Sequence, residues 1–99
     1  MSKQKMGLIF GGKSPEHEVS IISARNIFNA IDKNKFEVQL IGIAQNGKWY
    51  LETEENLQDK NCVIGKSGVQ LAVVFGNETH KFLRLDNHKY IENIKVVFP

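Results

Sequence analysis

The stretch from residue 6 to residue 24 constrains the fold of this chain more than any other. Residues 7–10, Gly-Leu-Ile-Phe, form a short apolar run of the kind found in a strand that is covered on both faces. Gly11 and Gly12 follow directly, and glycine allows positive φ angles and a close approach of the backbone to its surroundings. The pattern therefore predicts a buried strand that ends in a glycine turn.

A helix is expected to begin after this turn and to cover residues 15–31. Ser14 occupies the expected N-cap position, and Pro15 follows at the first helical position, where its missing N–H costs nothing. Glu16 and Glu18 then fall in the first turn, where the helix dipole favours negative charge. The spacing of apolar residues predicts a buried face of Ile21, Ala24, Phe28 and Ile31, widened by Ile27, with Arg25, Asn26 and Asn29 on the other side.

A second strand is predicted over residues 36–44, which become apolar after the helix. Strand, helix and strand in this order form a βαβ unit, so the two strands should lie parallel in one sheet. Ligands of such sheets bind at the carboxyl ends of the strands. We expect Gly11, Gly12 and Glu16 at that edge.

The second half of the chain has shorter apolar segments and more turn residues. Asn46-Gly47 is a strong hairpin signal and predicts a strand over residues 48–51, where we expect Trp49 to cover the core rather than a ligand. Residues 52–60 are polar and are interpreted as a connection with one helical turn. Further strands are predicted over residues 69–75, 81–85 and 94–98, with turns at Gly76-Asn77 and Asp86-Asn87. The predicted fold class is α/β, a βαβ unit with inserted antiparallel hairpin strands.

The composition is that of a soluble domain that needs no highly charged partner. The chain has 99 residues, enough for one small domain, and its formal net charge is only +2. The basic residues are spread along the chain, so nothing indicates a nucleic-acid or membrane partner. The polar first residues do not resemble a signal peptide, and no apolar run approaches the ~20 residues of a membrane span. We therefore expect a cytoplasmic protein.

Glu16 is the main candidate for binding a ligand at the glycine turn. The stretch lacks Gly-x-Gly-x-x-Gly, and residues 7–14 match Gly-x-x-x-x-Gly-Lys-Ser only if residues 8–10 form a loop, against their strand pattern. A preorganised carboxylate at the mouth of such a turn suits an ammonium group better than a phosphate. Local physics favours the plainer alternative, that Glu16 only stabilises the helix start, and leaves ammonium binding open.

The histidines and the single cysteine form no motif for a metal or a nucleophile. His17 is adjacent to Glu16, so the two side chains should diverge on the helix. His80 and His88 have no companion at ligand spacing, and no metal site is expected. Cys62 excludes an internal disulfide and is interpreted as an ordinary structural or surface thiol.

Part of the sequence resembles a known family. The amino-terminal signature of the D-alanine–D-alanine ligases is similar to residues 10–20, Phe-Gly-Gly-Lys-Ser-Pro-Glu-His-Glu-Val-Ser, followed by Ser-Ala at residues 23–24. Residues 96–99 look like the strand before this family's His-Gly loop. The resemblance spans nearly the whole chain and is looser over residues 52–93. Shorter matches lie at residues 29–32, 36–38, 41–43 and 47–50.

This resemblance implies that residues 1–99 form the amino-terminal, Rossmann-like (pre-ATP-grasp) domain of a ligase used in peptidoglycan synthesis. ATP would phosphorylate the carboxylate of one D-alanine, and the amino group of a second D-alanine would attack the acyl phosphate. ATP and Mg²⁺ (or Mn²⁺) would bind to central and carboxy-terminal ATP-grasp domains that are absent from this chain. The chain alone should therefore be inactive, and the intact enzyme is expected to be a homodimer.

The resemblance also implies roles for individual residues. Glu16 would be the catalytic-site residue that binds the ammonium group of the first D-alanine. Gly11 and Gly12 would let the backbone pass close to that substrate, Val19 would pack near its methyl group, and Ser20 is a further substrate-binding candidate. Two alternatives stay open: a D-alanine–D-lactate or D-serine ligase with a similar signature, and a stand-alone module that binds a small molecule.

Overall fold

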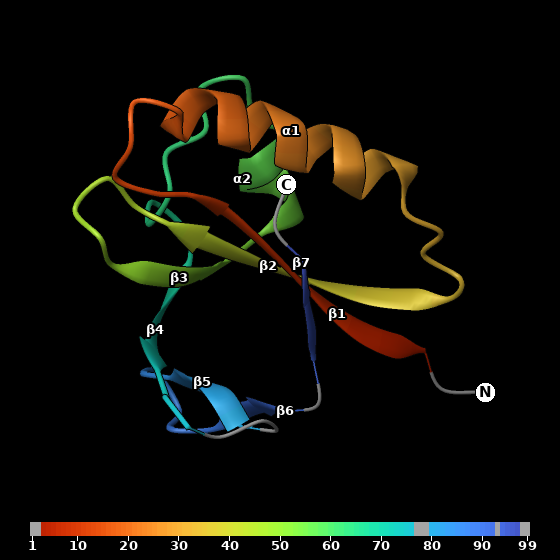
Figure 1. Cartoon of the computed structure of the whole chain (residues 1–99), viewed down its shortest axis with the longest axis vertical. Coiled ribbons are helices and arrows are strands. Elements are labelled where there is room, and N and C mark those ends of the chain that lie inside the picture. The colour runs from red at the N-terminus through yellow and green to blue at the C-terminus, as the bar shows by residue number, and fades with distance from the viewer. Residues whose placement is uncertain (1–2, 77–79, 93, 98–99) are drawn as a thin grey trace.

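The computed structural model describes residues 3–76, 80–92 and 94–97, which form one mixed sheet and two helices (Figure 1). The seven strands of the sheet lie in the order β6-β5-β4-β3-β2-β1-β7. The elements are β1 (Gln4–Gly11), α1 (His17–Ala30), β2 (Phe36–Ile43), β3 (Trp49–Glu52), α2 (Glu54–Gln58), β4 (Val69–Val73), β5 (His80–Arg84), β6 (Tyr90–Glu92) and β7 (Lys95–Val97). No helix within these ranges is long and apolar enough to cross a membrane.

Three parallel strands form the part of the sheet that carries the glycine turn. β1 pairs in parallel with β2 from Gln4↔Phe36 to Gly11↔Ile43, and on its other side it pairs in parallel with β7. α1 connects β1 to β2, so the predicted βαβ unit is confirmed. Because the strands are parallel, the carboxyl ends of β1 and β2 lie at the same edge of the sheet.

The helix α1 packs one apolar face on the sheet, as predicted. Leu8, Phe10 and Leu40 point from the sheet into a core that also holds Leu57 of α2 and Ile64. The buried residues of α1 are His17, Ile21, Ala24 and Phe28, while Ile27 packs against the core partly buried and Ile31 lies just beyond the helix end.

The predicted start of this helix is wrong by two residues. Glu16, not Ser14, is the N-cap residue, and its side chain makes no capping hydrogen bond. The His17 N–H donates to the Ser14 carbonyl (3.1 Å), so Ser14, Pro15 and Glu16 form a separate turn before the helix. As a result Glu18 lies in the first helical turn, whereas Glu16 precedes it.

A second core covers the opposite face of β1 and β2. Side chains alternate along a strand, so Ile9 and Ile41 point away from α1. They meet apolar residues of the hairpin strands, and Trp49 packs there against Phe82 with ring centroids 5.7 Å apart. This contact confirms the prediction that Trp49 covers the core. The buried members are Ile9, Ile41, Leu71, Phe82, Ile91 and Ile94.

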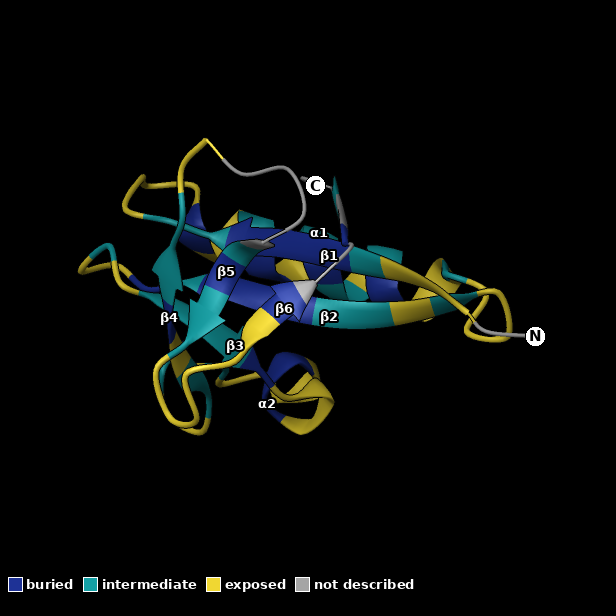
Figure 2. Ribbon diagram, turned by 90° about the horizontal axis from the view of Figure 1, so that it is seen from below, coloured by how far each residue is buried: buried dark blue, intermediate teal, exposed yellow. Residues whose placement is uncertain are grey.

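The hairpin strands continue the sheet and turn it back on itself. β3, β4, β5 and β6 follow β2 as successive antiparallel neighbours. This confirms the predicted strands β3, β4 and β5, whereas β6 was not predicted. β6 and β7 lie at opposite ends of the sheet, yet Glu92 and Lys95 are so close in sequence that at most about 11 Å of chain separates them. The sheet must therefore curl strongly, and Figures 1 and 2 show β4–β6 on the side away from α1.

The exposure expected for two charged residues differs from the structure. Glu52 was expected in a polar connection but ends β3 and is only 7% exposed, because α2 and the following loop cover it. Arg25 was expected to be exposed; it is half-buried and donates to the carbonyls of Leu57 (2.9 Å) and Asp59 (3.0 Å) at the end of α2. Predictions on Asn77, Phe98 and the side chain of His80 lie outside the described residues.

Candidate functional site

The glycine turn at the end of β1 is tightly packed on one side and open on the other. Gly11 and Gly12 have φ angles of +90° and +108°, which favour glycine. A Cβ on Gly11 would lie 2.4 Å from the Ile43 carbonyl oxygen and 2.5 Å from Ile64 Cδ1. A Cβ on Gly12 would have no atom within 4 Å. The backbone is thus exposed to a ligand at Gly12, while Gly11 anchors the turn.

The polar backbone groups of this turn already have partners inside the protein. The Gly11 N–H donates to Ser20 Oγ (3.0 Å), and the Gly12 N–H donates to the Ile43 carbonyl (2.8 Å). The Gly12 carbonyl lies 2.6 Å from His17 Nδ1. A phosphate cradle needs free N–H groups, so these glycines do not form one. Residues 8–10 lie within β1, which also excludes a phosphate loop over residues 7–14.

His17 is the residue that sequence analysis missed in this turn. Its side chain is buried (6% exposed), and a carbonyl can only accept, so Nδ1 carries the proton in the bond to Gly12. A signal was present in the sequence, because His17 precedes Ile21 and Ala24 at the spacing of the buried helix face. The prediction that it diverges from Glu16 agrees with this inward orientation.

Glu16 presents a carboxylate to solvent beside the turn. The residue is exposed, and its backbone N–H donates to Ser14 Oγ (3.2 Å), which fixes the main chain there. The Ser20 N–H donates to the Glu16 carbonyl (2.8 Å). Among the described residues, no cation lies within ion-pair distance of the Glu16 side chain. The carboxylate is therefore positioned through its backbone and left available.

The structure brings most of the predicted site residues to one edge of the sheet. At this edge Gly11 donates to Ser20 Oγ, and Gly12 is bonded to His17 and Ile43. Glu16 lies between Gly12 and Ser20 in sequence. Ser20 thus reaches from α1 back to the glycine turn. Val19 is 55% exposed and lies one helical turn after Glu16, where residues three apart are surface neighbours.

The β2–β3 turn borders the same edge through Lys13. The Lys13 side chain extends over Gly47, since a Cβ built on Gly47 would lie 2.6 Å from Lys13 Cε. Gly47 has a φ angle of +88°, as the Asn46-Gly47 hairpin signal predicts. Lys13 therefore places a positive charge at this edge of the sheet, at a position that the motif alone does not reveal.

A buried carboxylate supports the glycine turn from behind. Glu52 Oε1 accepts from Asn56 Nδ2 (2.8 Å), and Glu52 Oε2 accepts from the Gly65 N–H (2.6 Å). Asn56 Nδ2 also donates to the Val63 carbonyl (3.0 Å). These bonds hold both sides of Ile64, the residue whose side chain fills the space next to Gly11.

Cys62 is half-buried and packs against the core beside α1. Burial raises the pKa of the half-buried Cys62 thiol above its usual value, and the negative charge of Glu52 adds to this. A raised pKa keeps the thiol protonated at neutral pH, as expected of an ordinary structural cysteine. In the part of the chain that the structure describes, no three His, Cys, Asp or Glu side chains group as metal ligands.

Comparisons with known proteins agree along the whole chain. The family profile described as D-ala D-ala ligase N-terminus matches residues 5–99. The chain is 40% identical to D-alanine–D-alanine ligase A of Salmonella typhimurium and 41% identical to the D-alanine–D-alanine ligase of Shouchella clausii. Both alignments cover 100% of this chain, but only 29% and 28% of those proteins. The chain thus spans less than a third of the length of these relatives.

Solved structures show the same fold. The VanG D-Ala:D-Ser ligase of Enterococcus faecalis superposes with a TM-score of 0.78 and 29% identity, over 96% of this chain and 29% of that one. The D-alanine–D-alanine ligase of Coxiella burnetii gives a TM-score of 0.73 and 30% identity, over 91% and 27% of the two chains. The α/β fold class expected from the sequence is therefore confirmed.

Proposed function

Because this chain belongs to the family of D-alanine–D-alanine ligase N-terminal domains, we propose that it is the substrate-side domain of such a ligase. In this proposal residues 1–99 hold the first D-alanine, whose carboxylate becomes an acyl phosphate that the amino group of the second D-alanine attacks. The enzyme acts in the cytoplasm in peptidoglycan synthesis and functions as a homodimer. The relatives' greater length supports the view that further domains complete the site.

The described residues do not fit a nucleotide or a magnesium ion. The N–H groups of Gly11 and Gly12 already donate to Ser20 and Ile43. The described ranges contain no acidic cluster for a metal. We therefore assign ATP and Mg²⁺ (or Mn²⁺) to parts of the ligase outside this chain. This chain's own contribution is to bind and orient the amino acid.

One observation carries the proposal: the Glu16 carboxylate is exposed, its backbone is held by hydrogen bonds, and no cation among the described residues forms an ion pair with it. An ammonium group placed there would form a charge-assisted hydrogen bond, which is stronger than a bond between neutral groups. The open side of Gly12 leaves room for the backbone of the amino acid, and Val19 offers an apolar surface to its methyl group. Gly11 and Ser20 shape this surface through their mutual hydrogen bond. Substrate contact by these residues remains a prediction.

Replacing Glu16 by Gln in the full-length ligase tests this role. The exchange keeps the size of the side chain and removes its charge. We expect the KM for D-alanine at the first site to rise about tenfold or more, which corresponds to the strength of a hydrogen bond to a charged group. Steady-state kinetics at varied D-alanine would measure the change. Thermal unfolding should be nearly unaffected, because the Glu16 side chain makes no capping bond.

Glu18→Gln is the matched control for this experiment. Glu18 is also exposed and lies in the first turn of α1, but it is two residues further along and faces another direction. We expect its KM to stay at the wild-type value. An unchanged KM in Glu16→Gln, or an equal rise in both variants, would remove Glu16 from the substrate site.

A second candidate function is a ligase that uses D-serine or D-lactate as the second substrate. The superposition on a D-Ala:D-Ser ligase supports keeping it. Offering D-alanine together with D-serine or D-lactate to the full-length enzyme, and identifying the dipeptide or depsipeptide formed, separates the two. A stand-alone binding module would instead bind D-alanine as the isolated chain and show no such product in any longer form.

A further inference from the structure

A second pocket lies at the other end of β1, far from the glycine turn. Its volume is about 270 Å³, and it opens between β1, β2 and the turn that joins β5 to β6. Lys5 lines it near the start of β1, six residues before Gly11, which is about 20 Å along an extended strand. No residue of the proposed substrate site lines this pocket.

Every charged side chain that lines the pocket is positive. Lys5, Arg84 and Lys89 come from β1, from the end of β5 and from the segment before β6. The fold thus brings Lys5, from the first strand, to the same pocket as two cations that flank the β5–β6 turn. Like charges this close raise each other's energy, and no hydrogen bond or ion pair of the Lys5 or Lys89 side chain occurs among the described residues.

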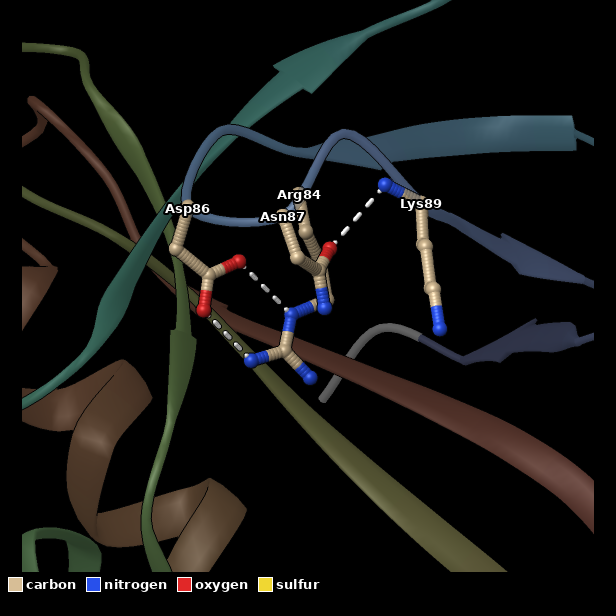
Figure 3. Close-up of polar contacts among 4 residues, drawn as sticks. All are labelled: Arg84, Asp86, Asn87 and Lys89. Carbon is tan, nitrogen blue, oxygen red and sulfur yellow. Dashed lines mark hydrogen bonds and ion pairs between the residues drawn. The ribbon is translucent and has the colours of Figure 1, made fainter.

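The turn holds Arg84 in a defined geometry (Figure 3). Arg84 Nε donates to Asp86 Oδ1 (3.0 Å) and Arg84 Nη2 donates to Asp86 Oδ2 (2.8 Å), which is a two-pronged ion pair. Asn87 Oδ1 accepts from the Lys89 N–H (3.0 Å) and closes the turn. The second terminal nitrogen of Arg84 has no acceptor in the part of the chain described. It is a preorganised donor.

Among the described side chains, the carboxylates of Asp86 and Glu37 belong to neighbours of residues that line the pocket. Asp86 is occupied by Arg84, and Glu37 stands opposite Lys5 in the β1–β2 register but forms no ion pair with it. Lys5, Arg84 and Lys89 against Asp86 and Glu37 leave a net charge of 3 − 2 = +1. Leu51 and Ile91 add an apolar part to the wall. A ligand suited to this pocket carries negative charge and a carbon skeleton.

We propose that this pocket binds the phosphate group of a small phosphomonoester. Such a group carries close to two negative charges above its second pKa of about 6 and offers three acceptor oxygens. Arg84 would donate from its unused nitrogen, Lys5 and Lys89 would contribute charge, and the organic part would contact Leu51 and Ile91. The site is separate from the proposed D-alanine site, so the proposal does not depend on the ligase reaction.

Titration with phenyl phosphate, followed by the backbone amide resonances of the ¹⁵N-labelled chain at pH 7.5 and low salt, tests this proposal. We expect shifts grouped at Lys5, Gln39, Asn87 and Lys89. Inorganic phosphate should bind several-fold more weakly, because it lacks the apolar contact. Equal affinity for the two probes would overturn the assignment of an organic phosphate. Shifts spread over all lysines would reduce the effect to nonspecific charge attraction.

Three variants make the test residue-specific. Arg84→Gln and Lys89→Gln should each lower the affinity for phenyl phosphate about tenfold, since each removes a charged donor. Lys66→Gln is the matched control: it makes the same change in net charge on an exposed lysine of a different surface pocket, and its affinity should stay unchanged. Equal weakening in Lys66→Gln, or no weakening in Arg84→Gln with unchanged thermal unfolding, would overturn the proposal.

Discussion

Gly11 and Gly12 have the same backbone requirement but very different surroundings. Gly11→Ala would force a Cβ against the Ile43 carbonyl and Ile64, whereas Gly12→Ala would place it in open space. We expect Gly11→Ala to lower the free energy of unfolding by about 3 kcal/mol or more, from overpacking and positive-φ strain together. Gly12→Ala should cost about 1–2 kcal/mol from strain alone. Urea unfolding measures both, and equal losses would contradict the role assigned to the Ile43 contact.

Asp86 should titrate below the usual range of an aspartate. The hydrogen bonds from Arg84 lower the pKa of its carboxyl, and the charge of Arg84 acts in the same direction. A lowered pKa in the folded state contributes stability above the unfolded value of about 3.9, and this contribution is lost as the pH falls through the folded value. A carboxyl NMR titration should give a midpoint below 3.9 that returns upward in Arg84→Gln. An unchanged midpoint in that variant would contradict the ion pair.

Single residues were predictable where their role is local. The positive φ angles of Gly11, Gly12 and Gly47 follow from residue type and turn pattern. His17 and Glu52 were missed because their partners come from elsewhere: the Gly12 carbonyl in one case, and Asn56 and Gly65 in the other. A charged or polar residue in sequence looks exposed unless the packing that satisfies it is known.

The β5–β6 turn contains a strained residue. His88 has a φ angle of +59°, in the left-handed region that costs a non-glycine residue about 1–2 kcal/mol. We expect His88→Gly to raise the free energy of unfolding by about 0.5–1 kcal/mol, the strain relieved minus the added freedom of glycine in the unfolded chain. Differential scanning calorimetry would detect the rise as a higher Tm.

Asn87→Gly is the control for this turn. Asn87 has no positive φ angle, and its side chain accepts the Lys89 N–H, so its replacement should lower stability. A rise in Tm in both variants would mean that the turn simply favours glycine, without a special strain at His88.

The elements themselves followed from local patterns, and their ends did not. The buried face of α1 and the alternation in β2 are visible in the sequence, because each residue's exposure repeats with the period of its element. The start of α1 was misplaced because Ser14 and Pro15 suit an N-cap and a first helical position. In the structure both residues belong to a separate turn before the helix. Both alternatives satisfy the same backbone donors, so residue type could not separate them.

The curvature of the sheet was beyond local prediction. Hairpin signals indicated β3, β4 and β5, but nothing in those segments shows that β6 ends near β7. That arrangement depends on contacts between distant residues, such as Ile9 with the hairpin strands across the second core. The candidate site needed only the β1 turn and α1, which are adjacent in sequence, and it was therefore the more predictable part.

The two cores should unfold together, because β1 and β2 contribute to both. Ile21→Val removes a methylene group from the core beside α1 and should cost about 1 kcal/mol, lowering the Tm by about 4–8 °C. Trp49 lies on the other core, so its fluorescence reports that side. We expect the Tm measured by circular dichroism and the Tm measured by Trp49 fluorescence to fall by the same amount. A lower Tm by circular dichroism with an unchanged Tm by fluorescence would show that the two cores unfold independently.

β1 lies between β2 and β7, so its pairing is complete only after β7 has been synthesised. Its pairs with β7 include Met6↔Lys95, residues 95 − 6 = 89 positions apart. A ribosome that adds roughly 5–20 residues per second leaves this side of β1 without its neighbour for about 4–18 s. The unpaired edge of a strand can form hydrogen bonds with other chains. The exposed charge of Lys5, near the start of β1, opposes such pairing. The first strand to be made is thus among the last to be enclosed.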